Sequence, residues 1–246
     1  MAERNIRLDI QYKGTDFAGW QFQPDAVTVQ GEIEKAIEKI TGKEVRLVGA
    51  GRTDAGVHAL GQAANFIIDH NLEPDRYKDA INHFLPKTIL IVLSSEVDKD
   101  FNARFQAKSR FYRYIISREK SALYFNYRWE TNYKLNLELL NKMAALLHGK
   151  HDFNTFCVVS SLKENNECEI YSAEWKKHGS QIIFEIKANR FLHSMVRSLV
   201  GLMVQLCREN DDLTLNKFED IMKSGDHTRI KLVAPARGLY LVKVSY

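Results

Sequence analysis

The side chains best suited to chemistry lie in a glycine-rich stretch at residues 49–58, Gly-Ala-Gly-Arg-Thr-Asp-Ala-Gly-Val-His. Within it, Arg52 and Asp54 are two positions apart, and in an extended segment such residues point to the same face. A cation and a carboxylate would therefore share one opening. The three glycines permit backbone conformations that a side chain would forbid, and they let another molecule approach the main chain. We expect a loop in which Asp54 is either a catalytic carboxylate or the cap of a tight turn.

The start of this stretch is similar to a dinucleotide-binding turn, but the continuation opposes that interpretation. The third glycine position of such a turn is occupied by Asp54, whose charge would repel a pyrophosphate. The residues that follow, Ala63 to Ile68, have the pattern of a strand and not of a phosphate-binding helix. We therefore expect no nucleotide cofactor.

Metal and disulfide chemistry are not expected either. The three cysteines show neither close pairing nor an even number: Cys157, Cys168 and Cys207. His148, His151 and Asp152 could in principle ligate a metal, but the preceding helix should end at Gly149, so a structural turn is expected there. His58 and His193 lie near the motifs described below and are expected to act as hydrogen-bonding supports.

Length and composition indicate an ordinary globular protein. The 246 residues are 45% hydrophobic and 27% charged, which is enough for one large domain or two small ones. A formal net charge of +4 fits an anionic partner without requiring one. The N-terminus has no apolar stretch of signal-peptide type, so secretion is not expected, and the most apolar region, 199–206, is too short to span a bilayer. The three cysteines suit a reducing cytoplasm, which is the expected compartment.

Apolar periodicity predicts two α+β halves, residues 1–106 and 107–246. In the first, strands are expected at 6–12, 45–48, 63–68 and 89–97, with helices beginning at Val29 and Pro74. The resulting order, β-α-β-β-α-β, is the ferredoxin-like arrangement. The second half repeats it loosely, with strands at 110–117, 170–187 (a hairpin) and 239–244, and helices at 135–147, 191–207 and 215–222.

The helix within 191–207 carries one charge in apolar surroundings. Nearly every position from Met195 to Cys207 is apolar, yet Arg197 points away from the main apolar stripe. A buried guanidinium without a partner is costly, so a carboxylate should lie beside it. Glu185, in the same half, is one candidate, and it would make the pair purely structural.

Five motifs in this order together resemble the tRNA pseudouridine synthase A (TruA) family and extend over almost the whole chain. They are Tyr12-Lys13-Gly14 with Gly19-Trp20-Gln21, the Gly-Arg-Thr-Asp-Ala-Gly-Val-His block at 51–58, Arg-Phe-Tyr-Arg-Tyr at 110–114, Phe-Leu-His-Ser-Met-Val-Arg at 191–197, and Gly-Leu-Tyr-Leu at 238–241.

The resemblance implies a role for each candidate site residue. Asp54 would be the catalytic aspartate, acting as nucleophile at C1′ or C6 or as a base toward the 2′ hydrogen, with Arg52 assisting beside it. Tyr112 would stack on the target base, and Arg197 would pair with Asp54 and favour its ionised form. Further substrate contacts are expected at Lys13, Arg110 and Leu239.

The resemblance also implies an architecture and a substrate. Two ferredoxin-like (RRM-like) halves would form a continuous, mainly antiparallel sheet with helices on one face and a catalytic cleft between the halves. The protein would be a cytoplasmic homodimer that isomerises uridine to pseudouridine in the anticodon stem-loop of tRNA, at tRNA positions 38, 39 and 40, without cofactor or metal.

Alternatives remain at this point. A non-catalytic RNA-binding protein would use sheet aromatics but gives no reason for Asp54 with Arg197, and a pseudouridine synthase with a different RNA target would share the same motifs. A carboxylate hydrolase would need a second acid near Asp54, which the loop does not supply. Residues 158–169 carry more acid than base, although the family usually has a basic loop here, so the details of RNA binding could differ.

Overall fold

The computed structural model describes residues 3–209 and 213–246 as a mixed α+β protein whose strands are mostly antiparallel. The chain divides into two compact units, Met1–Lys108 with Tyr240–Tyr246, and Ser109–Leu239. The last residues therefore group with the first unit, although the sequence pattern had placed all of 107–246 together, because the final strand pairs with a strand of the first unit. Among the described residues, no helix is both long and apolar enough to cross a membrane.

The sheet of the first unit is centred on β1 (Arg4–Tyr12), which lies antiparallel between β3 (His58–Ile68) and β4 (Ile89–Val97). The edge of β3 also pairs with β2 (Val48–Gly49) and, in parallel, with β10 (Leu239–Ser245). The predicted strand at 45–48 is wrong over most of its length. The Leu47 N–H donates to the Glu34 carboxylate at 2.8 Å instead of joining a ladder, so only two residues pair.

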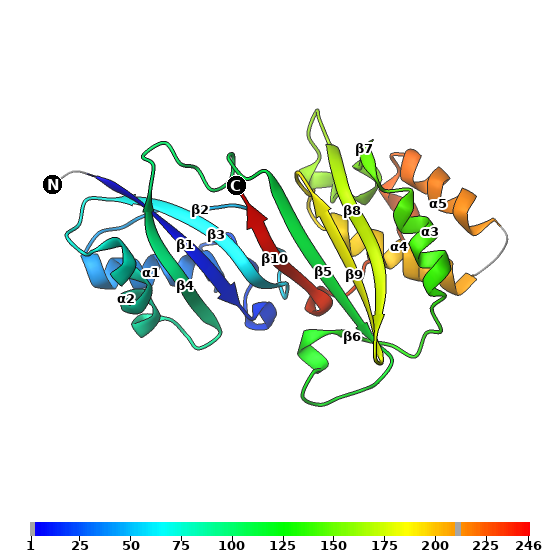
Figure 1. Cartoon of the computed structure of the whole chain (residues 1–246), viewed down its shortest axis with the longest axis horizontal. Helices are drawn as coiled ribbons and strands as arrows, with labels where there is room; N and C mark the ends of the chain where they lie inside the picture. The colour runs from blue at the N-terminus through cyan, green and yellow to red at the C-terminus, as the bar shows by residue number, and fades with distance from the viewer. Residues whose placement is uncertain (1–2, 210–212) are drawn as a thin grey trace. The chain divides into compact units, whose positions relative to one another are not determined.

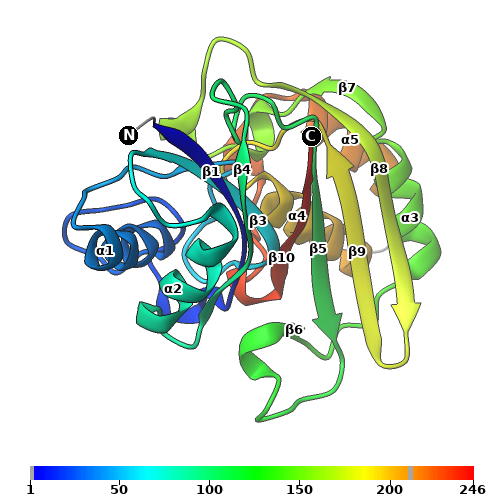
Figure 2. The same ribbon diagram turned by 60° about the vertical axis from the view of Figure 1, so that its left-hand side comes forward.

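Two helices cover this sheet, and the first has the predicted residues at both of its ends, whereas the second begins at Tyr77 and not at Pro74. α1 (Val29–Thr41) begins where the Thr28 hydroxyl accepts a hydrogen bond from the Gly31 N–H and ends at Gly42, whose φ of 68° is left-handed. α2 (Tyr77–Phe84) follows a 3-10 turn that starts at Pro74. Figure 2 shows α1 and α2 together on one side of β1, β3 and β4, where they bury the apolar face of the sheet.

In the second unit, β5 (Ser109–Ser117) pairs with β9 (Gln181–Ala188), β9 with β8 (Glu167–His178), and β8 with β7 (Gly149–Asp152), all antiparallel. β6 (Trp129–Glu130) runs parallel to β5. The Trp175 and Phe184 rings pack 4.8 Å apart, and the Trp175 indole N–H contacts the Met203 sulfur at 3.4 Å. Because Met203 belongs to α4 (Met195–Glu209), this contact identifies the face of β8 and β9 that carries the helices.

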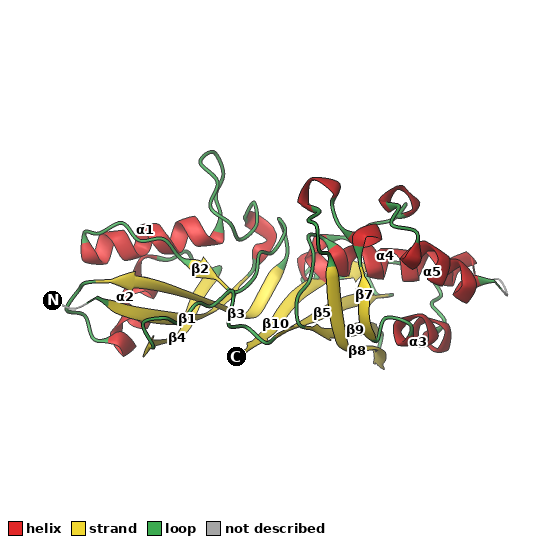
Figure 3. Ribbon diagram, turned by 90° about the horizontal axis from the view of Figure 1, so that it is seen from above, coloured by secondary structure: helices red, strands yellow, loops and turns green. Residues whose placement is uncertain are grey.

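Three helices accompany this sheet: α3 (Leu137–Ala145), α4 (Met195–Glu209) and α5 (Thr214–Lys223). Figures 1 and 3 show them next to one another. α4 begins later than the predicted Phe191, because Ser194 has a φ of 60° and this left-handed residue interrupts the helical path. The 3-10 turns are Gly14–Asp16, Pro74–Arg76, Phe125–Tyr127, Asn154–Phe156, Val159–Ser161, His227–Arg229 and Ala236–Gly238.

Candidate active site

The glycine-rich segment forms a loop between β2 and β3 of the first unit. A turn brings the Val57 N–H to the Asp54 carbonyl oxygen at 3.2 Å, and Gly56, with a φ of 80°, supplies the left-handed residue that a type II turn needs. Arg52 is exposed, Thr53 is buried and Asp54 is half-buried. This alternation agrees with the expectation that Arg52 and Asp54 point to the same side of an extended segment.

A network of three buried polar side chains supports the loop: Tyr12, Thr53 and Gln62. The hydroxyl oxygens of Tyr12 and Thr53 are hydrogen-bonded at 2.8 Å, and the Gln62 side chain also bonds the Tyr12 hydroxyl. The Gln62 amide donates to the Gly51 carbonyl oxygen at 2.8 Å, and Gln62 is fully buried. Burial raises the pKa of Tyr12 far above its ordinary value, so the phenol stays neutral and the network carries no net charge.

Close backbone packing fixes the loop from the other side. Gly14 lies against the Val57 carbonyl, where a Cβ atom would overlap the oxygen. The Trp20 indole fills the space beside Gly49, and the backbone N–H of Trp20 donates to the Thr53 carbonyl at 3.1 Å. The motif at 12–21 thus holds the loop in place. Gly14 must be a glycine because a Cβ atom does not fit against the Val57 carbonyl.

His58 supports the same region through a hydrogen bond to the backbone of Gly14. Its Nδ1 accepts a hydrogen bond from the Gly14 N–H at 3.1 Å, so in the neutral ring the hydrogen is on Nε2. The ring is 2% exposed and stacks on Tyr240 with 4.8 Å between centroids. Lys13, the other candidate here, donates its backbone N–H to Thr88 and places its ammonium 3.8 Å from the Asp16 carboxylate.

In the second unit, Tyr112 lies on β5 with its ring buried. It meets Phe191 edge to face, with centroids 5.0 Å apart and planes at 84°, so the orientation of the ring is defined. Arg110, two residues earlier on the strand, donates to the Asn189 carbonyl at 2.7 Å. Leu239 is buried at the start of β10.

Arg197 occupies the first turn of α4 and is half-buried. Its Nε donates to the Ala234 carbonyl at 2.9 Å, while the Ala234 N–H donates to the Arg197 carbonyl at 3.1 Å. Gly201, one turn further along, packs directly against the Leu232 carbonyl. The segment around 232–234 is therefore bound along α4, and it fixes the stem of the Arg197 side chain.

The prediction that Glu185 could be the structural partner of Arg197 is wrong. Glu185 follows Phe184 on β9, and alternation along the strand turns its carboxylate to the face opposite the helices. There it bonds Arg113 at 2.6 Å and Lys176 at 3.2 Å. Arg197 lies on α4, on the other side of the strand.

The structure thus brings Arg52 and Asp54 together on one loop and places Tyr112 and Arg110 on one strand. Asp54 and Arg197 belong to different units, and their pairing stays a prediction. Sequence reasoning missed the function of Gln62, although an amide among the small and apolar residues of 59–68 was a signal that it needed buried partners.

Cysteine nucleophiles are disfavoured by their surroundings. Cys157, Cys168 and Cys207 are buried and free. Burial raises the pKa of all three thiols, that of Cys168 to about 11, so they are protonated near neutral pH. Among the residues that the structure describes, no group of three or more His, Cys, Asp or Glu side chains could hold a metal ion. The carboxylate loop remains the place where chemistry is best supported.

A mixed α+β protein with a carboxylate on a rigid, glycine-lined loop is suited to an enzyme that uses this carboxylate as nucleophile or base. A sequence model described as tRNA pseudouridine synthase matches residues 10–106 and 143–246. The chain belongs to the tRNA pseudouridine synthase family.

Individual relatives match from end to end. The protein named tRNA pseudouridine synthase A from Thermoanaerobacter sp. strain X514 is 41% identical to this chain, over 99% of this chain and 100% of the relative. The protein of the same name from Chlorobium chlorochromatii strain CaD3 is 42% identical, over 99% of this chain and 100% of the relative. The protein of that name from Brachyspira hyodysenteriae is 41% identical over 96% of both chains.

Proposed function

We propose that this chain isomerises uridine to pseudouridine in the anticodon stem-loop of tRNA. Family membership and the names of the relatives support the reaction class and the substrate. The single observation in the chain that carries the proposal is the Asp54 loop, whose backbone is held by close packing and by a buried neutral network.

The reaction is balanced without any added reagent. The bond between N1 of uracil and C1′ of the ribose breaks, the base turns while it is held, and a bond forms between C5 and C1′. The hydrogen on C5 leaves as a proton and N1 gains one, so the product is an isomer of the substrate. The chain must therefore supply a group that accepts the sugar or base between these two bonds.

Asp54 is the nucleophile in this proposal, because its carboxylate lies half-buried on a loop that cannot easily shift. Arg52, exposed on the same loop, contacts the RNA beside it. Arg197 is the cation that this proposal assigns to Asp54 as its partner. The stem of Arg197, fixed by Ala234, suits that role.

The remaining contacts recognise the nucleotide. The target uridine must leave its stack, at a cost of a few kcal/mol that pocket contacts offset. Tyr112 stacks on the uracil, and its ring orientation is already set by Phe191. Lys13 and Arg110 contact the RNA backbone, and Leu239 packs against the base.

The finer architecture belongs to the same proposal. The two units are ferredoxin-like halves, the first with the order β1-α1-β2-β3-α2-β4. The protein acts in the cytoplasm as a homodimer.

The test is tritium release from tRNA that carries 5-³H-uridine, because forming the C5 bond expels that hydrogen. Wild type should release tritium, and Asp54→Asn, which keeps the shape of the side chain, should release none. Asp25→Asn is the matched control, since Asp25 is an exposed carboxylate on the same unit and should keep wild-type release. Tight tRNA binding by wild type without release from any tRNA would instead support a non-catalytic RNA-binding protein.

A further inference from the structure

The segment between β5 and β6, residues 118–128, exposes an unusual run of large side chains. Leu123 is 80% exposed, Tyr124 57%, Phe125 47% and Tyr127 37%. Single exposed apolar residues are ordinary, but several in a row mark a surface that binds something. We call this segment the aromatic loop.

The aromatic loop is anchored at its base. Arg128 and Glu130 form an ion pair at 3.1 Å with both side chains more than 90% buried. Arg128 also donates to the Glu119 carbonyl at 2.9 Å, and the Glu130 carboxylate accepts the Ser121 N–H at 2.8 Å. These bonds tie the beginning of the loop to its end, so the aromatic side chains are presented from a fixed frame.

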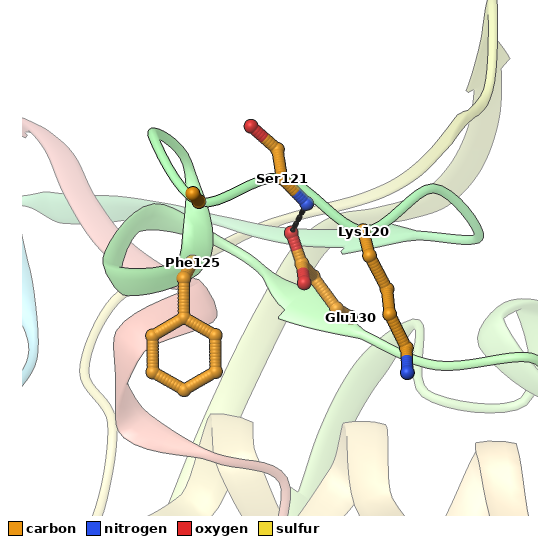
Figure 4. A pocket seen from close by; sticks show the side chains of 5 residues that line it. Lys120, Ser121, Phe125 and Glu130 are labelled. Carbon is orange, nitrogen blue, oxygen red and sulfur yellow. Dashed lines mark hydrogen bonds between the residues drawn. The ribbon is translucent and has the colours of Figure 1, made fainter.

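A pocket of about 460 Å³ opens beside the loop, a size that suits one small ligand group. In Figure 4, Phe125 and Lys120 extend in the same direction from the loop, and Glu130 lies between them. Only the Oε1 atom of Glu130 is used by Arg128 and Ser121. Among the described residues Oε2 meets no donor, so it is available to a hydroxyl or amino group of a ligand.

Arg237 adds a second cation to this site. Its guanidinium carbon lies 4.2 Å from the centre of the Phe125 ring, and within the described chain its buried Nε finds no hydrogen-bond acceptor. The turn that carries Arg237 is fixed, because the Tyr114 hydroxyl donates to the Pro235 carbonyl at 2.7 Å and Gly238 packs against the Tyr114 ring.

The charge balance of the site favours an anion. Among residues 3–209 and 213–246, neither Lys120 nor Arg237 makes an ion pair with a carboxylate, whereas Glu130 is neutralised by Arg128. Flat exposed rings flanked by unpaired cations provide what single-stranded RNA needs, stacking surfaces for bases and positive charge for phosphates.

We propose that the aromatic loop binds an unpaired nucleotide of the substrate RNA other than the reacting uridine. The base stacks on Phe125 with Tyr124 beside it, the phosphate lies between Lys120 and Arg237, and Glu130 Oε2 accepts the ribose 2′-hydroxyl. The inference rests on the proposed action on tRNA, and it assigns that RNA a contact away from Asp54.

The test measures binding of a fluorescently labelled tRNA transcript by anisotropy over a series of salt concentrations. Phe125→Leu should raise Kd about tenfold, the loss expected for one stacked base, and leave the salt dependence unchanged. Lys120→Gln should lower the slope of log K against log salt by about 0.7, the effect of one phosphate contact to a single strand. Leu123→Ala, the most exposed apolar side chain of the loop but not a ring, is the matched control and should bind as wild type.

The outcomes separate this inference from the proposed function. Wild-type Kd and salt slope in both Phe125→Leu and Lys120→Gln, with normal tritium release, would overturn the inference and leave the function intact. Weaker self-association of Phe125→Leu and Leu123→Ala in sedimentation equilibrium, with unchanged tRNA binding, would also overturn it, since the loop would then join two copies of this chain. If the wild-type protein releases no tritium from any tRNA but the two variants show the predicted changes in binding, the proposed function is overturned and the inference about the aromatic loop is kept.

Discussion

Replacing Gln62 with leucine tests whether the buried network positions the loop that carries Asp54. Leucine is similar in size but removes the hydrogen bonds to the Gly51 carbonyl and the Tyr12 hydroxyl. Each of the two lost bonds costs about 1 kcal/mol, and leaving the part-buried Gly51 carbonyl without a donor adds about 1–2 kcal/mol, so the free energy of unfolding should fall by about 3–4 kcal/mol. For a chain of this length the Tm should drop by roughly 5–15 °C.

Turnover should fall even under conditions in which the variant stays folded. At 25 °C the variant stays folded, but a loop displaced by about 1 Å can lower the rate about a hundredfold. We therefore expect kcat for tritium release to fall at least about tenfold, with circular dichroism unchanged. Gln23→Leu is the matched control, because Gln23 is an exposed glutamine whose amide also bonds a backbone carbonyl, that of Ala18 at 3.1 Å.

Two results would refute this reasoning. The first is a Gln62→Leu enzyme with kcat within twofold of wild type at 25 °C, which would mean that the loop keeps its geometry without the amide. The second is a kcat loss equal to the fraction of unfolded protein measured under the assay conditions, which would reduce Gln62 to an ordinary core residue.

Three further predictions follow from single positions. Gly14→Ala should destabilise the fold and abolish tritium release because its Cβ meets the Val57 carbonyl, whereas Gly51→Ala, with no atom within 4 Å of the new Cβ, should leave thermal stability near wild type. Ser194→Gly should keep or raise the Tm and Ser194→Val should lower it by several degrees, because a φ of 60° strains a β-branched residue. Desolvation raises the pKa of Glu185, but hydrogen bonds from Arg113 and Lys176 outweigh it, so the pKa in the folded protein lies below the ordinary value of 4.5. The carboxylate therefore stabilises the fold above pH 4.5, and this stabilisation is lost as the pH falls through the lowered pKa. When urea unfolding is measured at a series of pH values, Glu185→Gln should make the free energy of unfolding fall less steeply on the acid side.

Most elements could be predicted because their own residues determine them. α1 has a threonine at its start and a glycine at its end, and β4 spans the predicted residues 89–97. The errors occur where distant groups compete for the backbone. The 45–48 strand shrank because the Glu34 carboxylate takes the Leu47 N–H, and α4 started late because of the left-handed Ser194. Neither influence has a periodicity that a sequence window could reveal.

Part of the candidate site could also be predicted from the sequence, and part could not. Asp54 and Arg52 could be found from residue type and spacing, and a cation in an apolar helix drew attention to Arg197. The partner of Arg197 could not be predicted, because alternation on β9 had to be placed against α4 before Glu185 could be excluded. Family resemblance, not periodicity, supplied the role of Tyr112.

The neutrality of the network under the loop has a mechanistic consequence. Its hydrogen bonds end on Gly51 and Thr53, so they hold the backbone on both sides of Arg52 and directly before Asp54. A charged support there would add an electrostatic field at Asp54, whereas the neutral phenol and amide hold the loop without adding charge. An isomerase must keep one carboxylate in place while two bonds to the same sugar carbon are exchanged. Substitutions in the network should therefore lower kcat without moving the pH profile of the reaction.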